Sequence, residues 1–207
     1  MSDILLGCIQ RIRPERTVQK LKNLHELSLR ARKAFYELSV STLEQRNRAI
    51  LFLSELLEDH FDRISVANCE DQRIASEENL ASPLLHRLVF GEAKLSQTCD
   101  GLKALASLPD PLGSTTYSME LTEGLTLYRV ICPIGVIGVI FESRPDALIQ
   151  IASLCIKSGN AVLLKGGREA FRTNQILCEC VREALEKPAF HPMQRSSLKQ
   201  GKMLLPC

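Results

Sequence analysis

Two short apolar runs in the middle of the chain flank a stretch with helical periodicity. The runs, 134–141 and 161–164, are rich in branched residues and are bounded by Gly, Pro or Asn, which is typical of strands buried on both faces. Between them, residues 147–157 carry apolar side chains at helical spacing. A strand, a helix and a second strand within about thirty residues predict a βαβ unit with parallel strands.

Helical stripes also occupy the chain before this unit. They predict three helical stretches: 14–38, Ser41 to about Val66, and the segment after Pro83. Ser41 and Glu44 have the spacing of a capping box, which marks the start of the second stretch. The polar segment 68–79 predicts a frayed helix or a loop. Pro109 opens a short Pro-rich segment that ends the helical region.

Residues 114–132 have a different pattern, in which apolar and polar positions alternate on either side of Glu123 and Gly124. This alternation around a turn dipeptide predicts a β-hairpin. Two strands alone are marginal in water, so we expect the hairpin arm to pair with another sheet or another subunit. After the βαβ unit, residues 168–185 predict one more helix.

Together these patterns predict an α/β fold whose parallel sheet is incomplete, since no clear strand follows the last helix. The expected parts are a helical part over 1–113, the hairpin arm over 114–132, a βαβα part over 133–186 and a tail over 187–207. The tail has no Asp or Glu and no sustained apolar period, so it does not continue the pattern.

Composition narrows the function classes. The net charge is +2 and no basic stripe is interleaved with aromatic residues, so the chain lacks the footprint of a nucleic-acid-binding protein. No apolar run approaches the ~20 residues that span a bilayer. The N-terminus carries an acid where a secretory signal carries basic residues. The eight cysteines are scattered without a Cys-x-x-Cys pair, which predicts free thiols, no metal site and a cytoplasmic location.

Charged and small residues gather where the two parallel strands are expected to end. Glu142, Ser143 and Arg144 follow the first strand, and Lys165 ends the second. Open α/β sheets bind ligands at the carboxyl ends of their strands. We therefore expect a binding site there.

The segment from Lys165 through Gly166 and Gly167 to Arg168 and Glu169 predicts a corner that favours an anion or a ribose. The lysine could donate to hydroxyls or phosphate, the arginine could meet a 2′-phosphate, and the glutamate could accept from a ribose hydroxyl. The alternative is an ordinary helix start with solvated charges.

Two further features leave alternatives open. Pro145 holds Arg144 extended, and a planar guanidinium there suits a carboxylate or phosphate, or else a structural salt bridge. Gly135 and Gly138 lie in a predicted strand rather than in a turn that opens a helix, so they are not a dinucleotide fingerprint. They indicate either close packing against a helix or a close approach by a cofactor.

Residues 133–146 and 151–170 closely resemble the gamma-glutamyl phosphate reductase family, also called glutamate-5-semialdehyde dehydrogenase, of the aldehyde dehydrogenase superfamily. The resemblance implies a Rossmann-type parallel sheet. It also implies the NADPH-dependent reduction of L-glutamate 5-phosphate to L-glutamate 5-semialdehyde and phosphate in proline biosynthesis, downstream of glutamate 5-kinase. A cysteine thiolate attacks the acyl phosphate in that scheme.

The resemblance also implies roles for residues of this chain. Lys165 matches the superfamily lysine that holds the adenosine ribose, with 166–169 beside it. Arg144 falls in the motif on the substrate and nicotinamide side. The hairpin over 114–132 matches the oligomerisation arm of the family.

The family's catalytic cysteine belongs to a Gly-rich motif in a second domain downstream, and none of the eight cysteines here matches it. Cys155 is expected to be a core thiol. After about Leu185 the resemblance ends. Two readings follow: a reductase by lineage, present as its N-terminal portion, or a truncated, inactive remnant that at most binds nucleotide or oligomerises.

Overall fold

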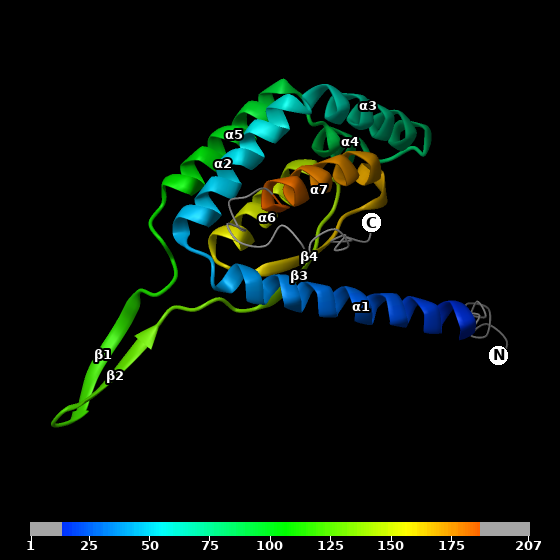
Figure 1. Cartoon of the computed structure of the whole chain (residues 1–207). Coiled ribbons are helices and arrows are strands. Elements are labelled where there is room, and N and C mark those ends of the chain that lie inside the picture. Colours follow the sequence, from blue (N-terminus) through cyan, green and yellow to red (C-terminus); the bar gives the residue numbers. More distant parts are fainter. Residues whose placement is uncertain (1–13, 187–207) are drawn as a thin grey trace, which may run out of the picture.

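The computed structural model describes residues 14–186, in which five helices precede a hairpin and a βαβα unit (Figure 1). The helices are α1 Pro14–Ser39, α2 Leu43–Asp59, α3 Phe61–Glu77, α4 Ser82–Leu88, α5 Glu92–Ser107, α6 Pro145–Lys157 and α7 Phe171–Glu186. The strands are β1 Thr115–Thr122, β2 Leu125–Val130, β3 Val136–Ile140 and β4 Ala161–Lys165, and a short 3₁₀ helix, η1, covers Arg168–Ala170. The tail that the sequence sets apart, 187–207, lies outside the described residues.

The apolar stripes of α2, α5, α6 and α7 meet in one core. Leu53 of α2, Ile149 of α6 and Leu177 of α7 are fully buried, and Leu102 of α5 is nearly so. Burying a large aliphatic side chain stabilises the fold by about 1.5–3 kcal/mol. Packing of these helical faces, rather than helix propensity alone, therefore holds the body together.

β3 and β4 pair in parallel, as the βαβ pattern predicts, with Val136 opposite Ala161 and Ile140 opposite Lys165. Figure 1 shows α1 below the two strands and α6 and α7 above them. The prediction that both strands are buried on both faces is wrong for β3. Its residues alternate between exposed and half-buried, and Ile140 is 83% exposed, because among the described residues β3 pairs with β4 alone.

Two helix predictions need correction. The capping box at the start of α2 is formed by Thr42 and Gln45, one residue later than Ser41 and Glu44. The polar segment 68–79, predicted to be a frayed helix or a loop, is regular helix as far as Glu77, where α3 ends.

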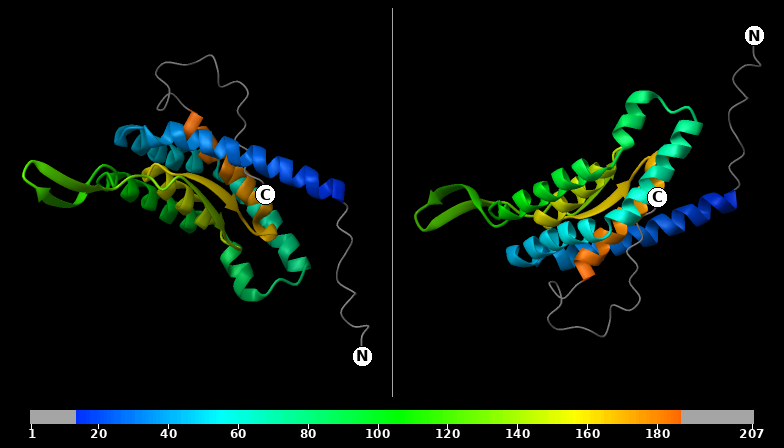
Figure 2. Two further views of the ribbon diagram at one scale, coloured as in Figure 1. Left: turned by 90° about the horizontal axis from the view of Figure 1, so that it is seen from below. Right: turned by 90° about the horizontal axis from the view of Figure 1, so that it is seen from above.

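The hairpin prediction is confirmed. β1 and β2 form an antiparallel pair, with Gly124 in the left-handed region at the turn, and the arm projects from the body in every view (Figures 1 and 2). Both strands are exposed along their whole length. Among the described residues they pair only with each other, so pairing with another subunit stays a prediction.

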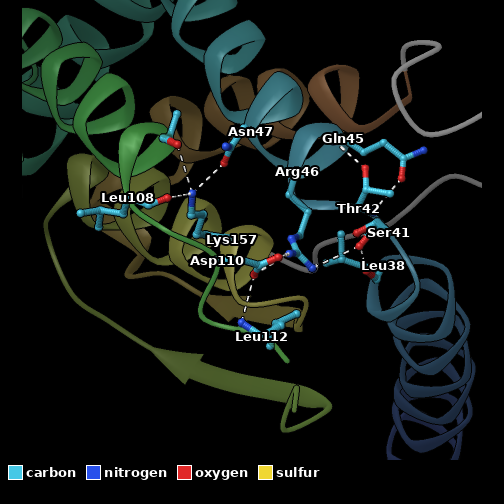
Figure 3. A network of polar contacts seen from close by, with 11 residues as sticks. Leu38, Ser41, Thr42, Gln45, Arg46, Asn47, Leu108, Asp110, Leu112 and Lys157 are labelled. Carbon is cyan, nitrogen blue, oxygen red and sulfur yellow. Dashed lines mark hydrogen bonds and ion pairs between the residues drawn. The ribbon is translucent and has the colours of Figure 1, made fainter. Parts of the chain in front are cut away.

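A buried polar network holds the root of the arm (Figure 3). Arg46 of α2 is 2% exposed, and its Nη2 donates to both carboxylate oxygens of Asp110 at 2.6 and 2.7 Å. Lys157, at the end of α6, donates to the carbonyls of Ala106 and Leu108 at 3.1 and 2.7 Å. A cation near the last carbonyls of a helix is stabilising, so Lys157 caps α5 just before the arm begins.

The turn between α6 and β4 receives both ends of the arm. Gly159 has a φ of +69°, and a Cβ there would lie 2.9 Å from Leu112 and 3.1 Å from Pro133. Asn160 accepts a hydrogen bond from the backbone N–H of Gly135 at 2.8 Å. Both the close approach and the left-handed backbone therefore favour glycine at 159.

Candidate functional site

The parallel register brings the two predicted segments together at one edge of the sheet. Ile140 and Lys165 are opposite each other, and the N–H of Phe141 donates to the carbonyl of Lys165 at 3.0 Å. The loop 142–144 therefore lies beside the corner 165–169. The expectation that these segments meet at the carboxyl ends of the strands is confirmed.

The two segments are joined through Ser143 and Glu169. The N–H and the hydroxyl of Ser143 both donate to Oε1 of Glu169, at 2.8 and 2.5 Å. Ser143 is 2% exposed and has a φ of +39°, in the left-handed region that non-glycine residues rarely adopt. The Glu169 carboxylate thus fixes a loop whose backbone would otherwise relax.

The environment lowers the pKa of Glu169. Burial acts to raise the pKa, but the Ser143 hydroxyl, the backbone N–H groups of Glu169 and Ser143, and the charge of Lys165 together outweigh it. A carboxylate with a lowered pKa adds stability above its ordinary pKa. That contribution is lost as the pH falls through the lowered pKa. Because the pKa is lowered, the carboxylate is charged at neutral pH.

The two glycines of the corner are required by different neighbours. A Cβ at Gly166 would lie 2.5 Å from Nδ2 of Asn174 and 3.3 Å from Cζ of Phe141. A Cβ at Gly167 would overlap the carboxylate of Glu169. Asn174 is 5% exposed, and its Oδ1 has no hydrogen-bond partner among the described residues. The side chains of Asn174 and Glu169 therefore pack closely against the backbone of the corner.

Two cations project from the corner. Lys165 is exposed, and its Nζ donates to the carbonyl of Gly166 at 2.8 Å. Arg168 is exposed, and its guanidinium pairs with none of the described residues. An anionic ligand at this edge would meet both cations, while the nearby Glu169 carboxylate is engaged by Ser143.

Arg144 is the N-cap residue of α6, with a φ of −139° and a ψ of 89°, outside the helical region as expected before proline. Its guanidinium donates to Asp146 at 2.9 Å, and this contact raises the pKa of Arg144. Asp146 is buried and also lies 3.4 Å from Lys94. The salt-bridge alternative is therefore present in the structure. The guanidinium of Arg144 is half-exposed and still has further N–H donors, and the neighbouring Glu142 is exposed.

Sequence reasoning missed the contacts that position helix α7. The predicted helix start at Arg168 is the short 3₁₀ helix, and α7 begins at Phe171. Asp71 of α3, 2% exposed, accepts from the backbone N–H groups of Arg172 and Thr173 at 3.3 and 2.8 Å. Because these amides are occupied, side-chain cations rather than the amides of α7 offer the corner its positive charge.

The remaining candidates are less informative. Close packing of a helix against Gly135 and Gly138 is wrong for both, since a Cβ at either would meet nothing within 4 Å. Gly135 also lies just before β3 rather than within it. Cys155 is a core thiol, as expected, and burial raises its pKa. Burial also raises the pKa of Cys180 to about 11. A thiol with a raised pKa is a poor nucleophile at neutral pH.

Within residues 14–186, no group of three or more His, Cys, Asp or Glu side chains could hold a metal ion. In the same residues, every helix is too short or too polar to cross a membrane.

No protein-family model matches the chain. Curated relatives do. The chain is 49% identical to the gamma-glutamyl phosphate reductase of Acetivibrio thermocellus over 170 residues, and 49% identical to gamma-glutamyl phosphate reductase 1 of Synechocystis over 172 residues. These alignments cover 82% and 83% of this chain. The chain is homologous to the N-terminal portion of gamma-glutamyl phosphate reductases. It spans 39% and 40% of the length of these two relatives.

Solved structures agree. The yeast gamma-glutamyl phosphate reductase matches with a TM-score of 0.76 and 38% identity over 79% of this chain and 42% of its own. The Thermotoga maritima enzyme matches with a TM-score of 0.76 and 33% identity over 81% and 41%. A putative aldehyde dehydrogenase from Bacillus subtilis, at 20% identity and a TM-score of 0.61 over 79% of this chain and 33% of its own, shows the shared fold.

Proposed function

We propose that this chain forms the cofactor side of an NADPH-dependent reductase that converts L-glutamate 5-phosphate to L-glutamate 5-semialdehyde and phosphate in proline biosynthesis. The supporting observation is the corner at the end of β4, where two exposed cations flank a glycine pair, in a chain homologous to gamma-glutamyl phosphate reductases. Cys99, Cys155 and Cys180 are buried free thiols, which favours the reducing cytoplasm.

The corner suits a phosphorylated nucleotide. Lys165 would hold the adenosine ribose, and Arg168 would pair with the 2′-phosphate that distinguishes NADPH from NADH. Gly166 and Gly167 are half-exposed and lack side chains, so a ligand could approach their backbone closely. When bound, the nicotinamide supplies the hydride for the reduction. The residues of this chain bind and orient the cofactor.

Glu142, Ser143 and Arg144 would line the substrate side. The glutamyl substrate carries a carboxylate and an acyl phosphate, both of which suit a guanidinium. Arg144 is tied to Asp146 by one nitrogen and is half-exposed, so it is held in place while further donors stay available. Glutamate 5-kinase would supply the substrate, because the acyl phosphate must come from a phosphoryl transfer to the side-chain carboxylate of glutamate.

The arm over 114–132 would mediate association with a second copy of the chain. Its two strands expose apolar side chains on both faces, and a hairpin of that kind is marginal in water unless it is covered.

The cofactor assignment is tested by titrating NADPH and NADH against the 207-residue chain. We expect Lys165→Ala to weaken both by about tenfold or more, the effect of losing a charged hydrogen bond. Arg168→Ala should weaken NADPH alone. The control is Lys103→Ala, since Lys103 pairs with Glu58 on the surface at 3.6 Å. Equal NADPH affinity of wild type and Lys165→Ala would contradict the assignment.

The reaction is followed in reverse, as NADP⁺ reduction that requires both L-glutamate 5-semialdehyde and phosphate. Turnover that needs both would support the reductase. NADPH binding without turnover would leave the chain as a nucleotide-binding portion only.

A further inference from the structure

The carboxylate of Glu169 is half-buried and lies between two backbone segments. It packs against the backbone of Gly167 on one side. On the other side, its Oε1 accepts both hydrogen bonds of Ser143, at 2.8 and 2.5 Å. This one oxygen therefore joins the loop after β3 to the corner after β4, although Ser143 and Glu169 are 26 residues apart.

The hydrogen bonds of Ser143 hold a backbone conformation that is unfavourable on its own. A serine at a φ of +39° persists when its surroundings over-determine it. Here two bonds to a charged acceptor, with Ser143 2% exposed, supply that restraint. Without the carboxylate, the buried N–H and hydroxyl would lose their acceptor and the loop would rearrange.

We propose that Glu169 is a positioning residue that acts through Ser143: it holds the loop 142–144 against the end of β4 and so keeps the cofactor corner assembled. The link to cofactor binding rests on the proposed function. In this arrangement Oε1 of Glu169 already accepts two bonds, so the oxygen that holds Ser143 is not needed to bind the ligand.

The same geometry has an electrostatic consequence. The carboxylate lies near enough to Lys165 for the lysine charge to lower its pKa, and the two hydrogen bonds of Ser143 hold Oε1 in that position. Displacing the carboxylate would release the loop and change the charge beside Lys165. We expect both changes to weaken the binding of NADPH.

Gly167 offers a way to disturb this contact without altering either partner. Its φ of −69° is allowed for alanine, but a Cβ would overlap the Glu169 carboxylate. The carboxylate is the end of a flexible side chain, so it can move aside and the protein can fold. Gly167→Ala should therefore reproduce the effect of Glu169→Ala. Gly138→Ala is the matched control, because its Cβ would meet nothing within 4 Å.

The first experiment measures amide hydrogen exchange at Ser143 by NMR in the full chain without cofactor. We expect Glu169→Ala and Gly167→Ala each to speed exchange by about tenfold or more, as expected for losing a charge-assisted hydrogen bond. Glu169→Gln keeps an acceptor oxygen and should retain much of the protection. Gly138→Ala should leave it unchanged. Unchanged exchange at Ser143 in Glu169→Ala and Gly167→Ala would overturn the proposal.

The second experiment is a double-mutant cycle for NADPH affinity with Ser143→Ala and Glu169→Ala. If Glu169 acts through Ser143, the Kd of the double variant should lie within about twofold of that of Glu169→Ala, because contacting residues are not additive. Independent, multiplying losses would instead mean that Glu169 contacts the ligand directly and would overturn the positioning role. If wild type does not bind NADPH, the proposed function fails, and the exchange data alone decide whether Glu169 holds the loop.

Discussion

At Gly166 the backbone lies against the buried side-chain amide of Asn174, and this contact explains why position 166 is a glycine. The side chain below it, Asn174, is 5% exposed and short, so it has little room to move. The neighbour of Gly167 is instead the end of a longer side chain. Adjacent glycines are therefore required to different degrees.

We predict that Gly166→Ala destabilises the protein by about 1–3 kcal/mol, because it overpacks the contact with Asn174 and Phe141. Gly167→Ala should cost less, since the carboxylate of Glu169 can move aside. Urea denaturation followed by circular dichroism measures both. A free energy of unfolding for Gly166→Ala equal to that of wild type would show that the corner is more open than the structure indicates.

At the scale of elements, the segment 68–79 shows where sequence reasoning fails. It was predicted to be frayed because its residues are polar, yet Asn68 and Asp71 lie on the inner face of α3, each 2% exposed. The side-chain Nδ2 of Asn68 donates to the carbonyl of Leu88, and its Oδ1 accepts from the N–H of Phe90, both at 2.8 Å. Their partners lie about twenty to a hundred positions away in sequence, so no local pattern reveals them.

Asp71 gives an element-scale prediction. Asp71→Ala leaves the first amides of α7 and the Thr173 hydroxyl without their acceptor, at a cost of about 2–4 kcal/mol. The control is Glu70→Ala, which breaks an exposed pair with Arg73 on the surface of the same helix and should change the melting temperature little. Thermal unfolding of both variants gives the comparison. Equal melting temperatures would contradict a structural role for the cap.

The elements themselves followed from periodicity. The hairpin, the parallel βαβ unit and the approach of 142–144 to 165–169 were all predicted, because alternation, helical stripes and the carboxyl-end rule are local or topological. The capping residue Thr42 and the pair of Ser143 with Glu169 were not predicted. These depend on side-chain geometry, which spacing alone leaves open.

At the scale of the whole molecule, the arm gathers exposed apolar side chains along both of its strands. Met119 and Leu127 are opposite each other on the hairpin, and Leu127 is 49% exposed. The body, by contrast, has a large core and a small second cluster. The described protein thus combines a packed body with a projection that suits association.

We predict that the chain self-associates through the arm and that Leu127→Lys shifts it toward monomer by about tenfold in dissociation constant, as a charge placed in an apolar interface is costly. Val66→Lys is the control, since Val66 is 72% exposed on α3, outside the arm. Sedimentation velocity across a concentration series measures the shift. The arm would be excluded as the interface if wild type and Leu127→Lys sediment alike.

The root of the arm has a consequence for how the chain can vary. The N–H of Gly113 donates to the carbonyl of Ile131 at 2.9 Å, so the polypeptide leaves and re-enters the body at one point. Contacts of Gly159 and Asp110 fix the root of the arm. The packing of the body therefore does not depend on the number of residues in the arm. Hairpins of other lengths, or a different inserted module, could replace the arm without disturbing the corner 165–169 at the far end of β4.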